Sequence, residues 1–278
     1  MFSEKNAAAG VTFARGFKAA GVKAGIKKSG NLDLAMIYTE KEASVAGVFT
    51  QNAVAAAPVI VSREVVKTGS AHAIVANAGC ANACTGEVGL ANAHKMAALA
   101  AEELGCKADD VLVGSTGIIG VNLPMDKLAA GIKAAAAELS EDGSKNAGNA
   151  IITTDTYSKA CSTEVEIGGK AVRFGAIAKG SGMIQPNMAT MLCYITTDAN
   201  ISSQLMQKAL SEIVEVTFNM ISVDGDMSTN DTVLVLANGE SGMAEIQADT
   251  PEYDKFCEVL GNMCRELSKR IAADGEGA

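Results

Sequence analysis

The chain lacks several residues on which common classes of enzyme depend. It contains no Trp, seven Phe, four Tyr and only two His among 278 residues. A Ser-His-Asp or Cys-His site would therefore have to use His72 or His94. His72 begins a predicted strand and His94 lies on an alanine-rich predicted helix. We expect both to be packed or solvated side chains and not catalytic ones.

Long apolar runs are also missing. No window of the chain approaches about 18 consecutive apolar residues, so no membrane span is predicted, and the N-terminal segment lacks the apolar region of a secretory signal. The seven cysteines are an odd number scattered through apolar runs, which is typical of reduced thiols in a cytoplasmic protein. Cys80 and Cys84 have no further ligands nearby, so we predict no metal site.

Positive charge is in deficit. The chain has 23 Lys and Arg against 32 Asp and Glu, for a net charge of −9. A phosphate backbone would be repelled, which argues against a nucleic-acid partner. The one basic cluster, from Lys18 to Lys28, is interpreted as a solvated, turn-rich segment.

Short β-type runs and helical patterns alternate along the whole chain, with no linker between them. We therefore predict one globular unit of the α/β (α+β) class, with layered sheets covered by helices in a sandwich. Gly168 and Gly169 predict a hairpin turn. Strands are predicted at 33–39, 46–50, 58–62, 71–76, 111–113, 163–167, 171–174, 191–195 and 232–237, and helices at 85–104, 122–139, 202–220 and 251–273.

The segment KGSGMIQPNMAT at 179–190, followed by the apolar run 191–195, is the most informative part of the sequence. Gly180 and Gly182 permit backbone angles closed to other residues, and Pro186 fixes its own φ. The small side chain of Ala189 leaves the carbonyl before Thr190 open to attack. One interpretation is an ordinary loop that enters a buried strand. The other is a threonine placed to cleave its own preceding peptide bond.

Cleavage between Ala189 and Thr190 would make the threonine a new N-terminus. Its hydroxyl and α-amine would then serve as nucleophile and base in one residue. The unperturbed pKa of an α-amine, about 7.7–8.0, suits a base near neutrality. Such a site needs no histidine.

Two further segments accompany this motif: GSTGIIG at 114–120 and VDGDMSTNDT at 223–232. Together the three segments resemble the ornithine acetyltransferase (glutamate N-acetyltransferase) family of arginine biosynthesis, and the resemblance extends from Gly16 to Ala278. It implies the fold of the self-processing N-terminal-nucleophile superfamily. It also implies autocleavage into an α-chain region, 1–189, and the start of a β-chain region, 190–278, which together form one intertwined unit.

The resemblance implies acetyl transfer from N-acetylornithine to glutamate through an acetyl-Thr190 intermediate. The scheme is ping-pong and uses no metal or bound organic cofactor; some relatives also accept acetyl-CoA as a co-substrate. The cleaved chains are expected to pair as a heterotetramer.

Site residues follow from the same resemblance. Thr116 and Gly117 match the pair that forms the oxyanion hole, although their loop alone would be interpreted as a tight turn. Thr153 matches a substrate-binding threonine, and Lys179 would hold a substrate carboxylate or keep the Thr190 amine neutral. Glu276 matches the glutamate that meets the side-chain ammonium of the substrate.

Two other functions stay open. A self-processing aminopeptidase or amidase of the same superfamily would use water as acyl acceptor, although serine is the usual nucleophile there. A non-catalytic, unprocessed protein is the other alternative, because family members continue past the position of Ala278 and we expect a C-terminal truncation. The segment 224–231 lacks the glycine and acid of a calcium loop, and is interpreted as a turn or a wall of the site.

Overall fold

The structure is a computed structural model that describes residues 9–185 and 191–276. In this part of the chain one hydrogen-bonded sheet of eight strands has the order β4-β3-β2-β8-β7-β6-β5, with β1 paired to β2. The strands are β1 (Phe17–Val22), β2 (Leu34–Phe49), β3 (Ser70–Cys80), β4 (Val111–Ile118), β5 (Lys159–Ile167), β6 (Lys170–Lys179), β7 (Leu192–Thr197) and β8 (Thr232–Ala237). Among these eight described strands, the pairs β3–β4 and β7–β8 are parallel and the others are antiparallel.

The sheet folds back on itself at β2, so that its two halves face each other. The first half of β2 pairs with β1 and β3, and its second half pairs with β8. Alternate residues of the strands confirm the two layers. Ile74 of β3 and Leu234 of β8 share one inner core, whereas their neighbours Val75 and Val235 belong to separate outer cores.

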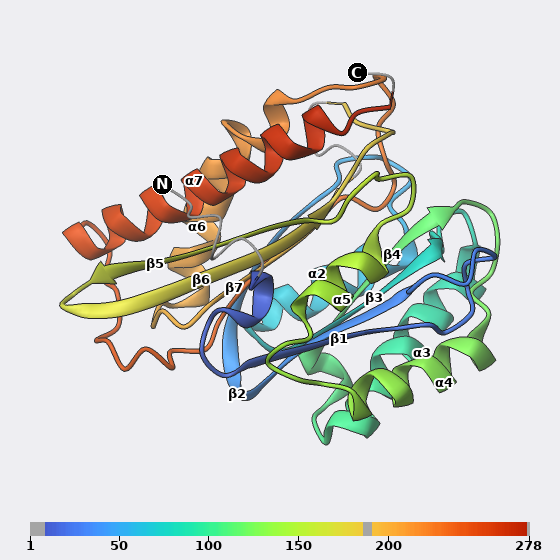
Figure 1. Cartoon of the computed structure of the whole chain (residues 1–278), viewed down its shortest axis with the longest axis horizontal. Helices are drawn as coiled ribbons and strands as arrows, with labels where there is room; N and C mark the ends of the chain where they lie inside the picture. Colours follow the sequence, from blue (N-terminus) through green and yellow to red (C-terminus); the bar gives the residue numbers. More distant parts are fainter. Residues whose placement is uncertain (1–8, 186–190, 277–278) are drawn as a thin grey trace.

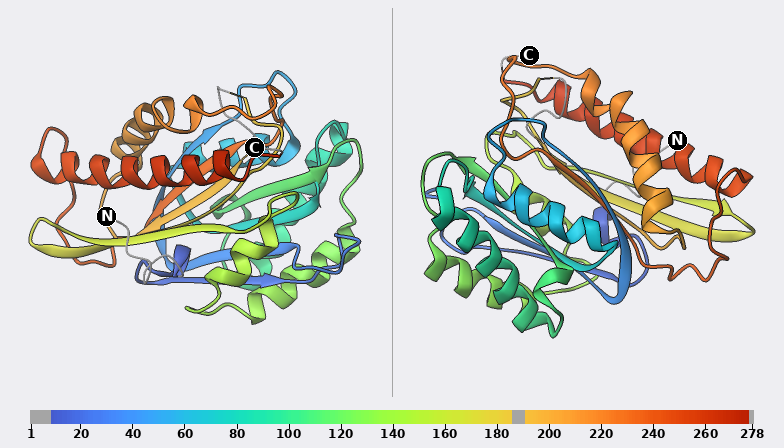
Figure 2. Two further views of the ribbon diagram at one scale, coloured as in Figure 1. Left: turned by 45° about the horizontal axis from the view of Figure 1, so that its top comes forward. Right: turned by 180° about the vertical axis from the view of Figure 1, so that it is seen from behind.

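Helices cover both outer faces, as Figures 1 and 2 show. The helices α2 (Ala57–Thr68), α3 (Gly86–Leu104) and α4 (Met125–Ala137) pack on the β1–β4 half. The helix α7 (Pro251–Ala273) packs on β5 and β6 of the other half, and α6 (Ser203–Glu215) packs on α7 and on β2. The short helix α5 (Ser144–Ile151) lies between the halves, where it contacts β1, β2 and β6. The predicted sandwich of sheets covered by helices is therefore confirmed.

Several elements match the sequence prediction closely. The hairpin β5–β6 turns at Gly168 and Gly169, which have φ of 57° and 73°. The helix α3 ends at Gly105, whose φ of 70° is left-handed. The helix α7 begins after Thr250, whose side chain accepts a hydrogen bond from the backbone N–H of Tyr253. Local capping and turn residues decided these boundaries.

The strand predicted at 58–62 is wrong, because these residues lie in the helix α2. Pro58 stands in its first turn, where the absent N–H costs nothing. Its buried positions include Pro58, Val61, Ser62 and Val65, a helical spacing that the three consecutive β-branched residues 59–61 concealed.

Two elements were missed. The basic cluster was predicted to be solvated turns, but its first five residues belong to the strand β1, which exposes only Lys18 among its six residues. The helix α5 lies beyond the end of the helix predicted at 122–139, where no element was predicted. The two elements pack closely on each other through a glycine: no Cβ could be added to Gly21 of β1, since it would lie 2.0 Å from the backbone oxygen of Asn146 in α5.

Candidate active site

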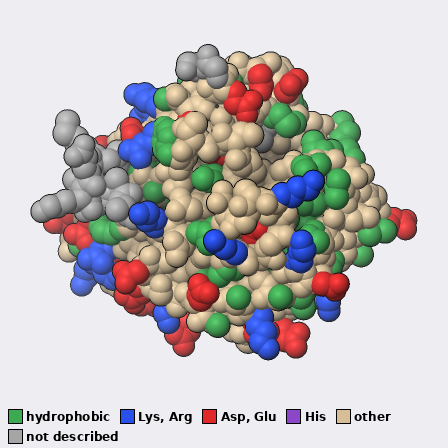
Figure 3. Space-filling model, turned by 45° about the vertical axis from the view of Figure 1, so that its right-hand side comes forward, with side chains coloured by type: hydrophobic (Ala, Val, Ile, Leu, Met, Phe, Trp, Pro, Cys, Tyr) green, Lys and Arg blue, Asp and Glu red, His purple; other side chains and the backbone are tan. Residues whose placement is uncertain are grey.

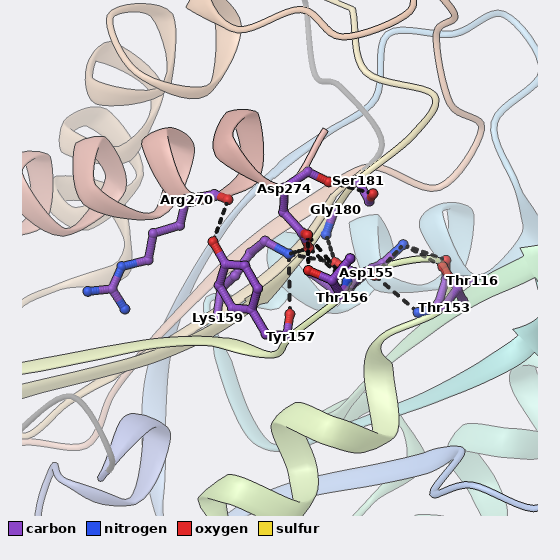
Figure 4. A network of polar contacts seen from close by, with 11 residues as sticks. Thr116, Thr153, Asp155, Thr156, Tyr157, Lys159, Gly180, Ser181, Arg270 and Asp274 are labelled. Atoms are coloured by element: carbon purple, nitrogen blue, oxygen red, sulfur yellow. Dashed lines mark hydrogen bonds and ion pairs between the residues drawn. The ribbon is translucent and has the colours of Figure 1, made fainter. Parts of the chain in front are cut away.

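Lys179 lies at the C-terminal end of β6 with only 2% of its surface exposed. Its Nζ donates hydrogen bonds to Thr153 Oγ1 at 3.0 Å and to Thr116 Oγ1 at 3.4 Å. The structure therefore brings three of the predicted site residues together from three separate segments. Figure 4 shows Thr116 and Thr153 at one end of this polar network.

Asp155 is the nearest carboxylate to this ammonium group. Its Oδ2 lies 3.7 Å from Lys179 Nζ, and its side chain is fully buried. Burial alone would raise the pKa of Asp155, but the ammonium groups of Lys179 and Lys159 lower it overall. Burial likewise lowers the pKa of Lys179, and the carboxylates of Asp155 and Asp231 only partly offset this.

Gly117 meets the neighbouring strand in a way that excludes any side chain. It pairs with Gly79 of β3 and has a φ of 130°. A Cβ added at Gly117 would lie 2.5 Å from the carbonyl carbon of Gly79. The glycine therefore lets β4 carry Thr116 to Lys179 while the backbone of the two strands stays in close contact.

Glu276 lies against the loop that follows Lys179. Its backbone N–H donates to the carbonyl of Ser181 at 3.3 Å. Its carboxylate carbon is 2.9 Å from the position that a Cβ on Gly182 would occupy. The structure thus places this predicted residue at the edge of the Lys179 cluster.

The predicted nucleophile Thr190 and the preceding Ala189 lie outside the described residues. The chain is described again at Met191, whose N–H donates to Asp231 Oδ1 at 2.9 Å. The next residue, Leu192, pairs with Lys179 in the sheet. The strand that follows the predicted nucleophile therefore begins beside the buried ammonium group.

Asp231 and Asn230 support the interpretation of 224–231 as a wall of the site. Asn230 Nδ2 donates to the carbonyl oxygens of Ala81 and Ser115, each at 2.8 Å, and thereby ties this segment to β4. Burial raises the pKa of the Asp231 carboxyl well above its usual range.

Three buried charged residues near Lys179 were not predicted from the sequence. Lys159 Nζ contacts Asp155 Oδ1 at 2.9 Å and Asp274 Oδ2 at 2.6 Å. Figure 4 shows Lys159 between the two carboxylates. Asp155 follows Thr153 by two residues, which was the one available signal; Asp274 is 115 residues from Lys159, and no local pattern joins them.

Charges are mixed on the outside of the molecule. On the face seen in Figure 3, Lys and Arg side chains alternate with Asp and Glu and form no single stripe.

Within 9–185 and 191–276, no group of three or more His, Cys, Asp or Glu could hold a metal ion. In the same ranges, none of the helices combines the length and the apolar character needed to cross a bilayer.

Comparison with known proteins identifies one family. The model of the ArgJ family matches residues 18–278. The arginine biosynthesis bifunctional protein ArgJ of Lactococcus lactis is 53% identical over 266 residues, which cover 95% of this chain and 66% of the relative. The protein of the same name from Symbiobacterium thermophilum is 51% identical, and the match covers 98% of this chain and 68% of the relative. The chain thus spans about two thirds of the length of these curated relatives.

Solved structures agree with this result. The ornithine acetyltransferase of Mycobacterium tuberculosis, complexed with ornithine, is 40% identical with a TM-score of 0.61; the match covers 66% of this chain and 97% of that chain. The L-aminopeptidase D-Ala-esterase/amidase of Ochrobactrum anthropi, a variant of the Ntn hydrolase fold, has a TM-score of 0.57 at 10% identity, over 96% of this chain and 85% of that chain. The second likeness concerns the fold alone.

Proposed function

The chain belongs to the ArgJ family, and on that premise we propose that it is an acetyltransferase that moves acetyl from N-acetylornithine to glutamate. The relatives are named for arginine biosynthesis, and a solved relative holds ornithine. Because the chain spans only about two thirds of the curated relatives, its substrates are assigned here by proposal.

One observation carries the proposal. Lys179 is a buried ammonium group that donates hydrogen bonds to two neutral hydroxyls, those of Thr153 and Thr116. It stands at the start of the loop that leads to Thr190. A buried cation without a tightly bound carboxylate is suited to an anionic ligand group, and N-acetylornithine and glutamate both carry an α-carboxylate.

The first reaction would be self-processing. Thr190 Oγ attacks the carbonyl carbon of Ala189, the peptide C–N bond breaks, and the freed nitrogen takes a proton to become the new α-amine. Water then hydrolyses the ester to release the carboxylate of Ala189 and regenerate the hydroxyl. The lengths of the relatives support this division into 1–189 and 190–278: the curated proteins are longer than this chain, whereas the matched solved chain is shorter.

The second reaction would be turnover. The α-amine of Thr190 takes the hydroxyl proton while Oγ attacks the acetyl carbonyl of N-acetylornithine. Backbone N–H groups near Gly117 and the Thr116 hydroxyl stabilise the tetrahedral oxyanion. Ornithine leaves with the proton. The neutral amine of glutamate then attacks the acetyl ester, the bond to Thr190 Oγ breaks, and the proton lost by the amine returns to Oγ through the α-amine, which gives N-acetylglutamate and the free hydroxyl. The proposed scheme uses no metal or organic cofactor. We also propose acetyl-CoA as a second acetyl donor, in keeping with the bifunctional name of the relatives.

The two ends of the donor would meet opposite charges. Lys179 would take the α-carboxylate with support from Thr153. Glu276 would take the side-chain ammonium of ornithine, since its carboxylate lies against Gly182 in the loop that follows Lys179. We further propose that the two cleaved chains stay together as one unit and associate as a heterotetramer.

The alternatives make different predictions. An aminopeptidase would transfer its acyl group to water, and the likeness to such an enzyme extends to the fold only. An unprocessed binding protein would remain one chain of 28.4 kDa. Neither alternative would form an acetylated enzyme that is stable in water and loses its acetyl group only when glutamate is added.

Mass spectrometry of the denatured protein tests the proposal. We expect two pieces that meet between residues 189 and 190. After incubation with N-acetylornithine, the C-terminal piece should gain the mass of one acetyl group, and added glutamate should remove it. A processed protein that never acquires the acetyl group would contradict acetyl transfer, and a single intact mass would contradict self-processing.

A further inference from the structure

A fully buried lysine outside the proposed catalytic set lies at the centre of the polar network. Lys159 has 0% of its surface exposed. Its Nζ contacts Asp274 Oδ2 at 2.6 Å, Asp155 Oδ1 at 2.9 Å and the carbonyl of Tyr157 at 3.3 Å. All three donors of this ammonium group are therefore in use, and it has none left for a ligand.

Asp155 is shared unequally between two lysines. Its Oδ1 accepts from Lys159 Nζ at 2.9 Å and from the N–H of Gly180 at 2.6 Å. Its Oδ2 accepts from the N–H of Thr153 at 3.1 Å and stays 3.7 Å from Lys179 Nζ. The carboxylate thus makes its hydrogen-bonded ion pair with Lys159 and only a longer contact with Lys179.

Lys179 is therefore a buried ammonium group without a closely hydrogen-bonded carboxylate. A buried ammonium normally requires a close, hydrogen-bonded carboxylate, and Asp155 is near enough to become one. We propose that Lys159 is a positioning residue: by holding Asp155 on its own ammonium, it prevents a tight Asp155–Lys179 pair and keeps Lys179 free for the carboxylate of a substrate. The inference rests on the proposed function only in assigning that carboxylate to Lys179.

The second partner of Lys159 extends the effect to Glu276. Asp274 also accepts hydrogen bonds from Thr156, and its own carbonyl accepts one from the Ser181 hydroxyl at 2.7 Å. Glu276 follows by two residues and binds the same Ser181 through its N–H. One ammonium group therefore holds both the loop beside Lys179 and the turn that carries Glu276.

The test uses Lys159→Met and the double variant Asp155→Asn/Lys159→Met in the full chain. N-acetylglycine is the probe, because it carries one carboxylate and no ammonium, and its dissociation constant is measured by NMR titration. We expect Lys159→Met to weaken binding by about tenfold, the loss expected for one hydrogen bond to a charged group. The double variant should recover most of this loss, because it no longer contains the competing carboxylate.

A crystal structure of Lys159→Met gives a readout independent of any ligand. Asp155 should move to within about 3 Å of Lys179 Nζ, the distance of a charge-assisted hydrogen bond. If Asp155 keeps its place, or if the double variant binds no better than Lys159→Met, the inference is wrong. If the unaltered protein does not bind N-acetylglycine, the proposed role of Lys179 fails, and the crystal structure alone decides the inference.

Controls separate this effect from a general loss of stability. Asp198 is another fully buried carboxylate, and it pairs with Arg15 at 2.6 Å away from the Lys179 cluster. Asp198→Asn should lower the melting temperature without raising the dissociation constant of N-acetylglycine. If Lys159→Met does not fold, lysine NMR of the unaltered protein replaces it: the probe should shift the Lys179 signal and leave that of Lys159 unchanged, and the reverse pattern would refute the inference.

Discussion

At the scale of single residues, the chemistry depends on what burial does to Lys179. A solvated lysine would be surrounded by water and would offer little to a ligand. Lys179 instead lies 2% exposed between two hydroxyls. Burial lowers its pKa, and the nearby carboxylate of Asp155, 3.7 Å from Nζ, opposes that effect only in part. A ligand carboxylate would complete this environment and be bound strongly for that reason.

The lowered pKa of Lys179 predicts a pH dependence. Substrate binding needs the charged form, so it should be complete at low pH and be lost as the pH rises through a pKa below the ordinary value of about 10.4. The rate needs a neutral Thr190 amine and should rise through about pH 7.7–8.0. We therefore expect a bell-shaped profile of kcat/KM. Lys179→Arg keeps its charge at any accessible pH and should move the alkaline limb upward; an unmoved limb would remove Lys179 from this role.

The nucleophile predicts a pair of variants with opposite behaviour. Thr190→Ala should leave the chain intact and abolish acetyl transfer, because the hydroxyl is needed in both reactions. Thr190→Ser keeps the hydroxyl and should still cleave. Denaturing electrophoresis and intact mass decide the matter. Fragments that meet at 189 and 190 in the alanine variant would show that another group performs the cleavage.

At the scale of elements, the paired ends of β3 and β4 shape the site. Gly79 and Gly117 are opposite each other in register, and both have positive φ, 109° and 130°. Two glycines face to face allow the strands to approach where side chains would keep them apart. This close contact between the strands holds Thr116 Oγ1 at 3.4 Å from Lys179 Nζ.

Gly117→Ala tests that contact, with Gly120→Ala as its control. Both glycines have positive φ, so both variants carry backbone strain. Only Gly117 has a neighbour in the way: its Cβ would lie 2.5 Å from Gly79, whereas a Cβ on Gly120 has nothing within 4 Å. We expect Gly117→Ala to cost about 1–3 kcal/mol more than Gly120→Ala in chemical denaturation, and to slow self-cleavage. Equal stabilities would mean that the strands can separate without penalty.

At the scale of the whole molecule, the site lies where distant segments meet. Thr116 comes from the β1–β4 half of the sheet, and Lys179 from the β5–β8 half. The turn after α7 adds Glu276 from the far end of the chain. Folding of the sheet at β2 is what brings these segments together, and the two halves must therefore be in place before the site exists.

The length of the relatives predicts a difference between cleavage and turnover. Self-cleavage needs Thr190, its loop and nearby hydrogen-bond donors. Transfer also needs the substrate held in a reactive position, and loss of positioning can cost about 10²-fold. We expect residues 1–278 to cleave themselves, and ornithine release to increase when the chain is extended with the remaining segment of the Lactococcus lactis relative. Equal activity with and without the extension would show that 1–278 holds the complete site.

Interactions within a few residues explain which parts of the fold could be predicted. The helices α3 and α7 and the turn at Gly168 and Gly169 were predicted correctly from caps and left-handed glycines. The helix α2 was mistaken for a strand, because Val59, Ile60 and Val61 have high β propensity and the burial that overrides it comes from β4 and α3. The strand β1 and the helix α5 were missed because they pack closely on each other at Gly21, a contact that exists only in the folded protein.

The amino-acid sequence by itself determined the type of fold, the family and the residues proposed for the chemistry. Short motifs such as KGSGMIQPNMAT and GSTGIIG are contiguous, so they can be recognised without the structure. The tertiary structure alone decided how charge is distributed around them. The contact of Lys159 with Asp274 joins positions 115 residues apart. No local pattern encodes such a pairing, since an ion pair in a protein interior forms wherever folding removes both charges from water together.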